Sequence, residues 1–235
     1  MRRAGPTLRN RLWPLFEAQL FEVPGSSTLF NPYLDEDPRY DVPGAPAIRQ
    51  ANLGAYLDAL TVPDFVLVAE APGPNGARFS GVPLTSEAQL TAPDAFLAGQ
   101  PTSIGMPLAE YSARIVHRAL GADWARVLIW NTVPFHPHPP GKPRGIRAPT
   151  RAEVLRFQPL LAGVVAAAAP AQVLAVGRVA ERALREIGVA ATYLRHPSQG
   201  GARLFAEGLR AALGGSAGEG DRRGNAGAVV ARSLR

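Results

Sequence analysis

The chain has 235 residues, a length that suits one domain with a single well-buried core. Its 46% hydrophobic and 19% charged residues exclude an intrinsically disordered protein. Because there is no cysteine, disulfides, thiol nucleophiles, cysteine-held zinc and thiolate-ligated iron–sulfur clusters are excluded as well. The formal charge of +6 fits binding to a polyanion, although an Arg-rich composition can equally reflect a GC-rich coding bias.

No apolar run in the sequence has the length of a membrane span, and the basic start of the chain lacks the apolar core of a signal peptide. The most apolar stretch, 160–177, is divided by Pro170 and Gln172 into a helix and a strand. We therefore expect a cytoplasmic protein without membrane contact.

Helical and strand patterns alternate along the chain. Short runs rich in Val, Leu and Ile predict strands buried on both faces; they span 65–70, 126–131, 172–177 and 191–196. Apolar residues at helical spacing predict helices over 7–22, 47–60, 108–120, 150–169, 178–187 and 202–213. This order predicts an α/β protein with a mainly parallel four-stranded sheet.

Several local signals mark the ends of these elements. Thr150 and Glu153 have the spacing of a capping box at a helix start, while Pro159 is expected to kink the same helix. Gly121 and Gly188 follow two of the helices as C-terminal caps. We expect one domain over 1–213 and a disordered tail over 214–235, where almost no apolar pattern remains.

Three polar side chains follow different predicted strands: Glu70, Asn131 and His196. In a parallel sheet the ligand site lies beyond the carboxyl ends of the strands, so these side chains are expected to converge there. An amide in an apolar pocket suits the edge of a nucleobase, because it offers acceptor and donors in one plane. The alternative is that Asn131 only satisfies loop backbone.

Other sites are disfavoured by the sequence. The glycines after the first strand do not form a G-x-G-x-x-G motif, and the Gly-Lys-Pro at 141–143 lacks the hydroxyl residue of a phosphate-binding loop. His136 and His138 could bind a metal, but Pro137 between them and no obvious third ligand make this the weaker reading. No nucleophile-elbow motif surrounds Ser198.

Short motifs in the chain resemble those of the uracil-DNA glycosylase superfamily, in the same order, and are closest to its G-E-A-P-G type. They are AEAPG (69–73), GVPLTSE (81–87), LIWNTVPFHPHPPG (128–141) and RHPSQGG (195–201), with FNPYLDEDP (30–38) and RAPT (147–150) similar to further segments of bacterial relatives. The resemblance implies a three-layer α/β/α sandwich with a central sheet and a DNA glycosylase that needs no cofactor or metal. It implies a monomer that flips uracil, and other deaminated bases, out of DNA to cleave the N-glycosidic bond.

The same resemblance assigns roles to individual residues. His196 would donate to uracil O2, Glu70 would orient the attacking water, and Asn131 would pair with O4 and N3–H. The pocket for the base would be formed by Ala71, Pro72, Gly73, Phe79, Leu84 and Asn131. DNA would be contacted from two loops by Lys142, Arg144, Arg147, Ser198, Gln199, Gly200 and Arg203, although both loops could be ordinary surface turns. Gln199 would fill the vacated base stack.

The chain departs from the family pattern at three points. Ala69 replaces a glycine, the cysteines of the iron–sulfur branches are missing, and Leu84 stands where the family has a Phe that stacks on the extruded base. Phe79 is close enough in sequence to substitute for that ring. Leu84 favours an alternative function, a module that binds damaged or single-stranded DNA with weak or no cleavage.

The expected enzyme is monofunctional, because no lysine near the strand ends could form a Schiff base. A nucleoside hydrolase is a third hypothesis, for which the basic loops would be idle.

Overall fold

The computed structural model describes residues 6–215. Its centre is a parallel sheet with the strand order β3-β2-β5-β6. The strands are β2 (Phe65–Ala69), β3 (Val127–Asn131), β5 (Gln172–Val176) and β6 (Thr192–Leu194). The four predicted strands and their parallel arrangement are therefore confirmed.

Strand β2 shows why these runs read as continuously apolar. All five of its residues are buried, but they alternate between two clusters: Phe65 and Leu67 pack on one side of the sheet, Val66 and Val68 on the other. A strand covered on both faces has no solvent side, so it carries no polar alternation.

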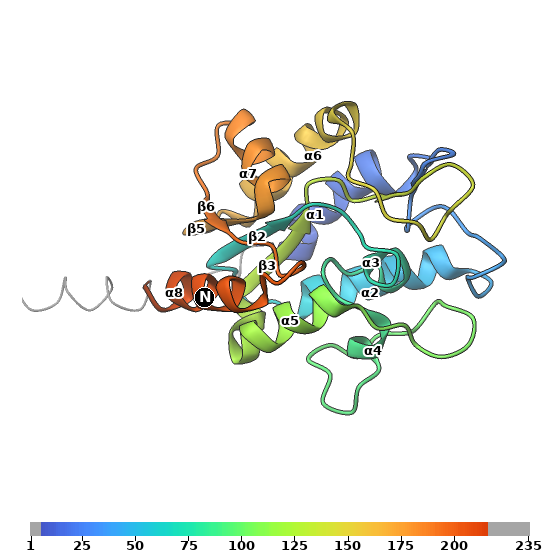
Figure 1. Ribbon diagram of the computed structural model, residues 1–235, viewed down its shortest axis with the longest axis horizontal. Helices are drawn as coiled ribbons and strands as arrows, with labels where there is room; N and C mark the ends of the chain where they lie inside the picture. Colours follow the sequence, from blue (N-terminus) through green and yellow to red (C-terminus); the bar gives the residue numbers. More distant parts are fainter. Residues whose placement is uncertain (1–5, 216–235) are drawn as a thin grey trace, which may run out of the picture.

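Helices cover both faces of the sheet, which confirms the three-layer sandwich (Figure 1). One layer contains α1 (Leu8–Phe16), α2 (Ala45–Ala59), α6 (Arg151–Ala168) and α7 (Gly177–Glu186). The other contains α5 (Tyr111–Leu120) and α8 (Ala202–Gly215). Along residues 6–215 no helix is both long and apolar enough to cross a bilayer.

Some predicted features of the helices are present, and some helix boundaries differ from the predictions. The capping box of Thr150 and Glu153 is present, and α6 continues through Pro159 as one helix. Helix α5 begins three residues later than predicted, and Leu108, which precedes it, donates its N–H to the Glu87 carboxylate. Of the predicted tail, 214 and 215 belong to α8 and the remainder lies outside the described residues.

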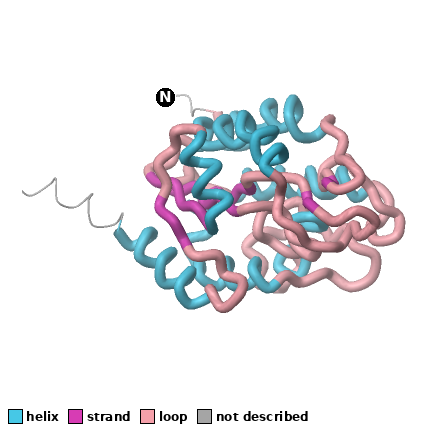
Figure 2. The backbone as a smooth tube through the Cα atoms, turned by 45° about the horizontal axis from the view of Figure 1, so that its top comes forward, coloured by secondary structure: helices cyan, strands magenta, loops and turns pink. Residues whose placement is uncertain are grey.

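Short elements complete the chain. They are the π-helical turn η1 (Glu17–Phe21), β1 (Leu29–Phe30), α3 (Ala77–Ser80), α4 (Glu87–Leu90), the 3-10 helix η2 (Gly121–Arg126) and β4 (His136–Pro137). Strands β1 and β4 pair antiparallel as a separate small sheet. Figure 2 shows that the long loops gather at one end of the molecule, around this small sheet.

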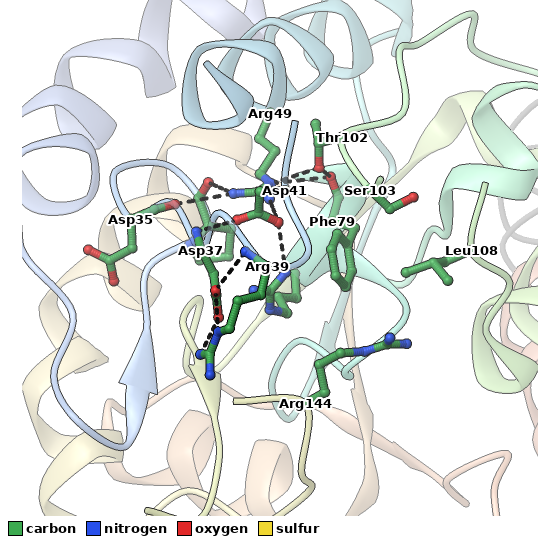
Figure 3. A network of polar contacts seen from close by, with 12 residues as sticks. Asp35, Asp37, Arg39, Asp41, Arg49, Phe79, Thr102, Ser103, Leu108 and Arg144 are labelled. Carbon is green, nitrogen blue, oxygen red and sulfur yellow. Dashed lines mark hydrogen bonds and ion pairs between the residues drawn. The ribbon is translucent and has the colours of Figure 1, made fainter. Parts of the chain in front are cut away.

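A buried ion cluster holds this loop-rich end together. The Asp41 carboxylate lies 2.6 Å from Arg49 Nη2 and 3.0 Å from Arg78 Nη1, and all three side chains are fully buried (Figure 3). The Arg78 guanidinium packs between the Phe30 and Phe79 rings, 4.2 and 4.1 Å from their centroids. The cluster therefore connects the segment before α2, α2 itself and α3.

The segment 30–38, whose likeness to bacterial relatives was noted above, makes structural contacts. The Asn31 Nδ2 group donates to the carbonyls of Leu20 and Val23, and the Tyr33 hydroxyl donates to the Gly81 carbonyl over 2.8 Å. Gly81 has φ +72°, and a methyl group there would lie 2.5 Å from the Arg49 carbonyl oxygen. Only glycine fits this position, which joins the N-terminal segment to the loop after α3.

Replacing Asp41 by alanine leaves two buried guanidinium groups without their carboxylate. We expect the free energy of unfolding, measured in urea, to fall by about 3–5 kcal/mol, the range for breaking a buried ion pair. Asp58→Ala, which removes the exposed partner of Arg9, is the control and should cost less than about 1 kcal/mol. Equal losses in the two variants would show that the buried cluster is not a principal support of the fold.

Candidate active site

Glu70 and Asn131 leave neighbouring strands at the same level. The residue before Glu70, Ala69, is paired in register with Asn131. Beyond the ladder, the Ala69 carbonyl accepts from the Thr132 N–H over 2.8 Å, and the Glu70 carbonyl accepts from the Val133 N–H over 3.0 Å. These bonds hold the two strand ends together past the sheet, so the carboxylate and the amide are anchored on rigid backbone.

The Glu70 side chain is partly buried and stands alone. Within residues 6–215 no hydrogen bond or ion pair engages its carboxylate. Burial raises the pKa of this carboxyl above its usual value, because desolvation disfavours the charged form. A carboxylate without a protein partner at the end of a central strand is available to a water molecule or a positively charged reaction centre.

Asn131 is 2% exposed, and its Oδ1 atom has no hydrogen-bond partner. An unsatisfied buried acceptor costs about 1–3 kcal/mol, and such groups in native proteins call for an explanation. If Asn131 served only to satisfy the loop backbone, its amide would be hydrogen-bonded to that backbone through Oδ1 or Nδ2, and no such bond occurs within residues 6–215. The open acceptor fits a ligand that brings its own N–H donor.

His196 follows β6 and is held in one orientation by its own loop. The Ser198 N–H donates to His196 Nδ1 over 3.1 Å, and the Ser198 hydroxyl lies 2.7 Å from the same atom. Because Nδ1 accepts, this network assigns the proton of the neutral ring to Nε2. Burial, helped by Arg195, lowers the pKa of His196, so the ring is a neutral Nε2–H donor at physiological pH.

The turn after His196 is tight. Gln199 and Gly200 both have positive φ, 52° and 76°, and both residues are exposed. A methyl group at Gly201 would lie 2.0 Å from the His196 carbonyl oxygen, so this glycine is required by close packing. Gln199 thus stands at the tip of a rigid turn, where its predicted role of filling a vacated base stack stays a prediction.

The proline-rich loop is fastened to the loop that carries Glu70. His136 Nδ1 donates to the Pro72 carbonyl over 2.8 Å, and burial lowers the pKa of His136 to about 4. The rings of His136 and His138 stack with centroids 5.9 Å apart. The described residues contain no group of three or more side chains that could hold a metal ion. Sequence reasoning weighed His136 only as a metal ligand, and the structure makes it a neutral clamp.

The predicted DNA-contacting cations differ in their surroundings. Lys142 and Arg144 are exposed near the tip of the loop, and Arg144 donates to Asn75 Oδ1 over 2.7 Å. Arg147 has all five N–H groups engaged, by Glu153 and by backbone carbonyls, and so anchors the loop to α6 and to Thr28, the residue before β1. Arg203 is exposed and pairs with Glu207. Lys142 and Arg144 are therefore the cations best placed for phosphate, and a contact from Arg147 would require it to exchange existing bonds.

The residues predicted to form the base pocket are also differently placed. Leu84 is buried in the core cluster that contains Ala69, and its φ is +47°. Phe79 is fully buried, with Arg78 4.1 Å and Arg144 5.8 Å from its ring centroid. Phe79 therefore lies among guanidinium groups inside the protein, and its role of stacking on a base stays a prediction.

Glu110 is a residue that sequence reasoning missed. Its carboxylate packs against the loop after Glu70. The approach is so close that methyl groups added at Gly73 and Gly76 would lie 2.6 and 1.7 Å from Glu110 Oε2. Neither glycine has positive φ. The Gly of the Ala-Pro-Gly motif is therefore explained by the approach of Glu110 as well as by the turn. Burial raises the pKa of Glu110 to about 7.

Glu110→Gln tests this burial through the pH dependence of stability. A carboxyl whose pKa is about 7 in the folded state and 4.5 as its reference contributes stability below pH 4.5 that is lost as the pH rises through 7. Between pH 4.5 and pH 7 we expect the free energy of unfolding of the variant to rise relative to that of the wild type. The change should be about 1.4 kcal/mol per unit of pKa shift.

Urea denaturation between pH 4.5 and 9 measures that difference, and Gly76→Ala is the matched variant because its methyl group displaces the carboxylate toward water. Both variants should weaken the pH dependence. A constant difference between Glu110→Gln and the wild type across this range would contradict the assigned burial.

Comparisons with known proteins show the family and the fold. The family model of the uracil DNA glycosylase superfamily matches residues 59–213. Among solved structures, wild-type Pedobacter heparinus SMUG2 is similar with a TM-score of 0.63 and 12% identity, over 90% of this chain and 98% of that chain. At this identity the likeness shows a shared fold, and no curated protein matches the chain. Because the family match covers more than half of the sequence and includes Glu70, Asn131 and His196, the chain belongs to the uracil DNA glycosylase superfamily, whose members act on DNA.

Proposed function

We propose that this protein is a monofunctional DNA glycosylase that releases uracil from DNA. The observation that carries the proposal is the unpaired Oδ1 acceptor of Asn131, buried at the end of β3 beside Glu70. Uracil presents an N3–H donor next to its O4 acceptor, so the amide matches both groups. Cytosine reverses these polarities, and a fixed amide should discriminate against it by about 1–3 kcal/mol.

The other two side chains suit the charges that develop during cleavage. As the bond between C1′ and N1 breaks, positive charge grows on the sugar and negative charge on the departing base. The Nε2–H of neutral His196 would donate to uracil O2, and the ionised Glu70 would stabilise the sugar cation and orient the water. The water oxygen bonds to C1′, one of its protons passes to Glu70, and the uracil anion leaves with the bonding electrons.

The base must be extruded before these groups can reach it, at a cost of a few kcal/mol in a duplex. Lys142 and Arg144 would hold the phosphates on one side, and the turn at Gln199 would enter the space left by the base. Basic side chains on a proline-stiffened loop that contacts the loop after Glu70 support this arrangement.

A second candidate function is a DNA-binding module without efficient cleavage. It is favoured by two residues of the predicted base pocket. Leu84 stands where the family has the stacking Phe, and the Phe79 ring packs against guanidinium groups. The two functions differ in base release and agree in salt-dependent DNA binding.

Uracil release from a labelled oligonucleotide, single-stranded and opposite G or A, separates the two functions. We expect the wild type to release uracil, and Glu70→Gln, Asn131→Ala and His196→Ala each to lower the single-turnover rate by tenfold or more, on the order of 1.4 kcal/mol or more in barrier. Asp58→Ala, which removes an exposed ion pair on α2, is the control for general effects of substitution.

The pH profile provides a further check. Because Glu70 must be ionised and burial raises its pKa, activity should fall on the acidic side at a pH above the ordinary glutamate pKa, and Glu70→Gln should lose this limb. If the wild type released none of the bases uracil, hypoxanthine and xanthine but bound DNA in a salt-sensitive way, the binding module would be favoured. Leu84→Phe is then the variant that should restore stacking.

A further inference from the structure

The loop between α4 and α5 exposes two apolar side chains at its tip. Ile104 is 57% and Met106 is 85% exposed, and Gly105 between them has φ +95°. The two side chains lie one residue apart at the same tip and form one apolar surface, and contiguous exposed apolar surface is typical of interaction sites.

The backbone on both sides of this tip is fixed by a fully buried carboxylate. Glu87 Oε1 accepts from the N–H groups of Thr102 and Ser103 over 2.5 and 2.8 Å. Glu87 Oε2 accepts from the Leu108 N–H over 3.0 Å and from the Ser103 hydroxyl. Four bonds to one carboxylate hold 102–108 as a closed turn, so the tip is presented on a rigid base.

A continuous set of contacts leads from the tip to the proposed DNA-binding surface. The Ile104 N–H donates to the Tyr40 carbonyl over 2.8 Å. The Arg144 guanidinium lies 5.4 Å from the Tyr40 ring centroid and donates to Asn75 in the loop after Glu70. Figure 3 shows Ser103, Leu108 and Arg144 placed around Phe79. The apolar tip thus adjoins both the basic loop and the loop of the candidate active site.

We propose that Ile104 and Met106 form a second wedge, which packs against the base stack of duplex DNA beside the extruded nucleotide. This inference rests on the proposed function. When Lys142 and Arg144 bind phosphates, the neighbouring apolar side chains are carried toward the same duplex. The surfaces of the duplex that Ile104 and Met106 would contact are base faces and sugars, because these are apolar while the phosphates are charged. Side chains of this type unstack base steps in other DNA-binding proteins.

A wedge acts only where a stack exists. In a duplex it offsets the cost of unstacking and unpairing the target base, whereas a single strand carries little of that cost. The double variant Ile104→Ser/Met106→Ser should therefore lower the single-turnover release of uracil from duplex DNA by about tenfold, through the loss of apolar burial. Release from a single strand of the same sequence should change by less than about twofold, because the active-site residues are untouched.

Val62→Ser is the matched control. Val62 is 77% exposed, but it precedes β2 and so lies at the amino-terminal end of the strands, opposite the candidate active site. Its substitution should leave both rates unchanged. Thermal unfolding of all three proteins should coincide, since the substituted side chains are exposed. Equal losses on duplex and single strand, or no loss on the duplex, would overturn the proposal.

Binding provides a readout that does not depend on cleavage. A fluorescent duplex with one tetrahydrofuran abasic-site analogue, which carries an unstacked gap, should bind the double variant about tenfold more weakly than the wild type, with an unchanged salt dependence because no cation is removed. Unaltered affinity for this duplex would overturn the wedge. If the wild type bound the duplex in this way and released no uracil, the wedge would stand and the glycosylase proposal would fail.

Discussion

Two buried guanidinium groups share the single carboxylate of Asp41, and the loop-rich end of the molecule is organised around them. Arg49 extends the cluster by donating to the carbonyls of Pro32, Asp35 and Phe79 and to the Thr102 hydroxyl. Segments far apart in the sequence are thereby fixed to one another. Desolvating these charges is costly, and burial lowers the pKa of Arg49 to about 10. The cluster consequently fixes one arrangement of the loops more than it adds to net stability.

Three glutamates near the active-site end show how surroundings divide one residue type into three roles. Glu87 accepts four hydrogen bonds and supports a turn. Glu110 is pressed against two glycines, and its pKa rises to about 7. Glu70 lacks a protein partner within the described part of the chain and remains available for chemistry. Neighbouring donors and access of water decide these differences, and residue type alone does not.

The two histidines that matter for the site also have opposite proton placements. His136 donates from Nδ1 to a backbone carbonyl and so ties two loops together. His196 accepts at Nδ1 and therefore carries its proton on Nε2. Both rings are neutral because burial lowers their pKa. One acts as a clamp and the other supplies a donor, and the difference arises from a single hydrogen-bond partner.

The sequence by itself determined the strands, the longer helices and the strand ends. Hydrophobic runs at strand and helix spacing are local, so the four strands, the six longer helices and the positions of Glu70, Asn131 and His196 at or just past strand ends could be read directly. What only the tertiary structure decided depends on contacts between distant segments. The engagement of Arg147 by Glu153, the covering of Phe79 by Arg78, the packing of Glu110 on Gly73 and the open acceptor of Asn131 have no local signature. Such contacts arise from side chains that meet across loops, where no periodic pattern records the partner.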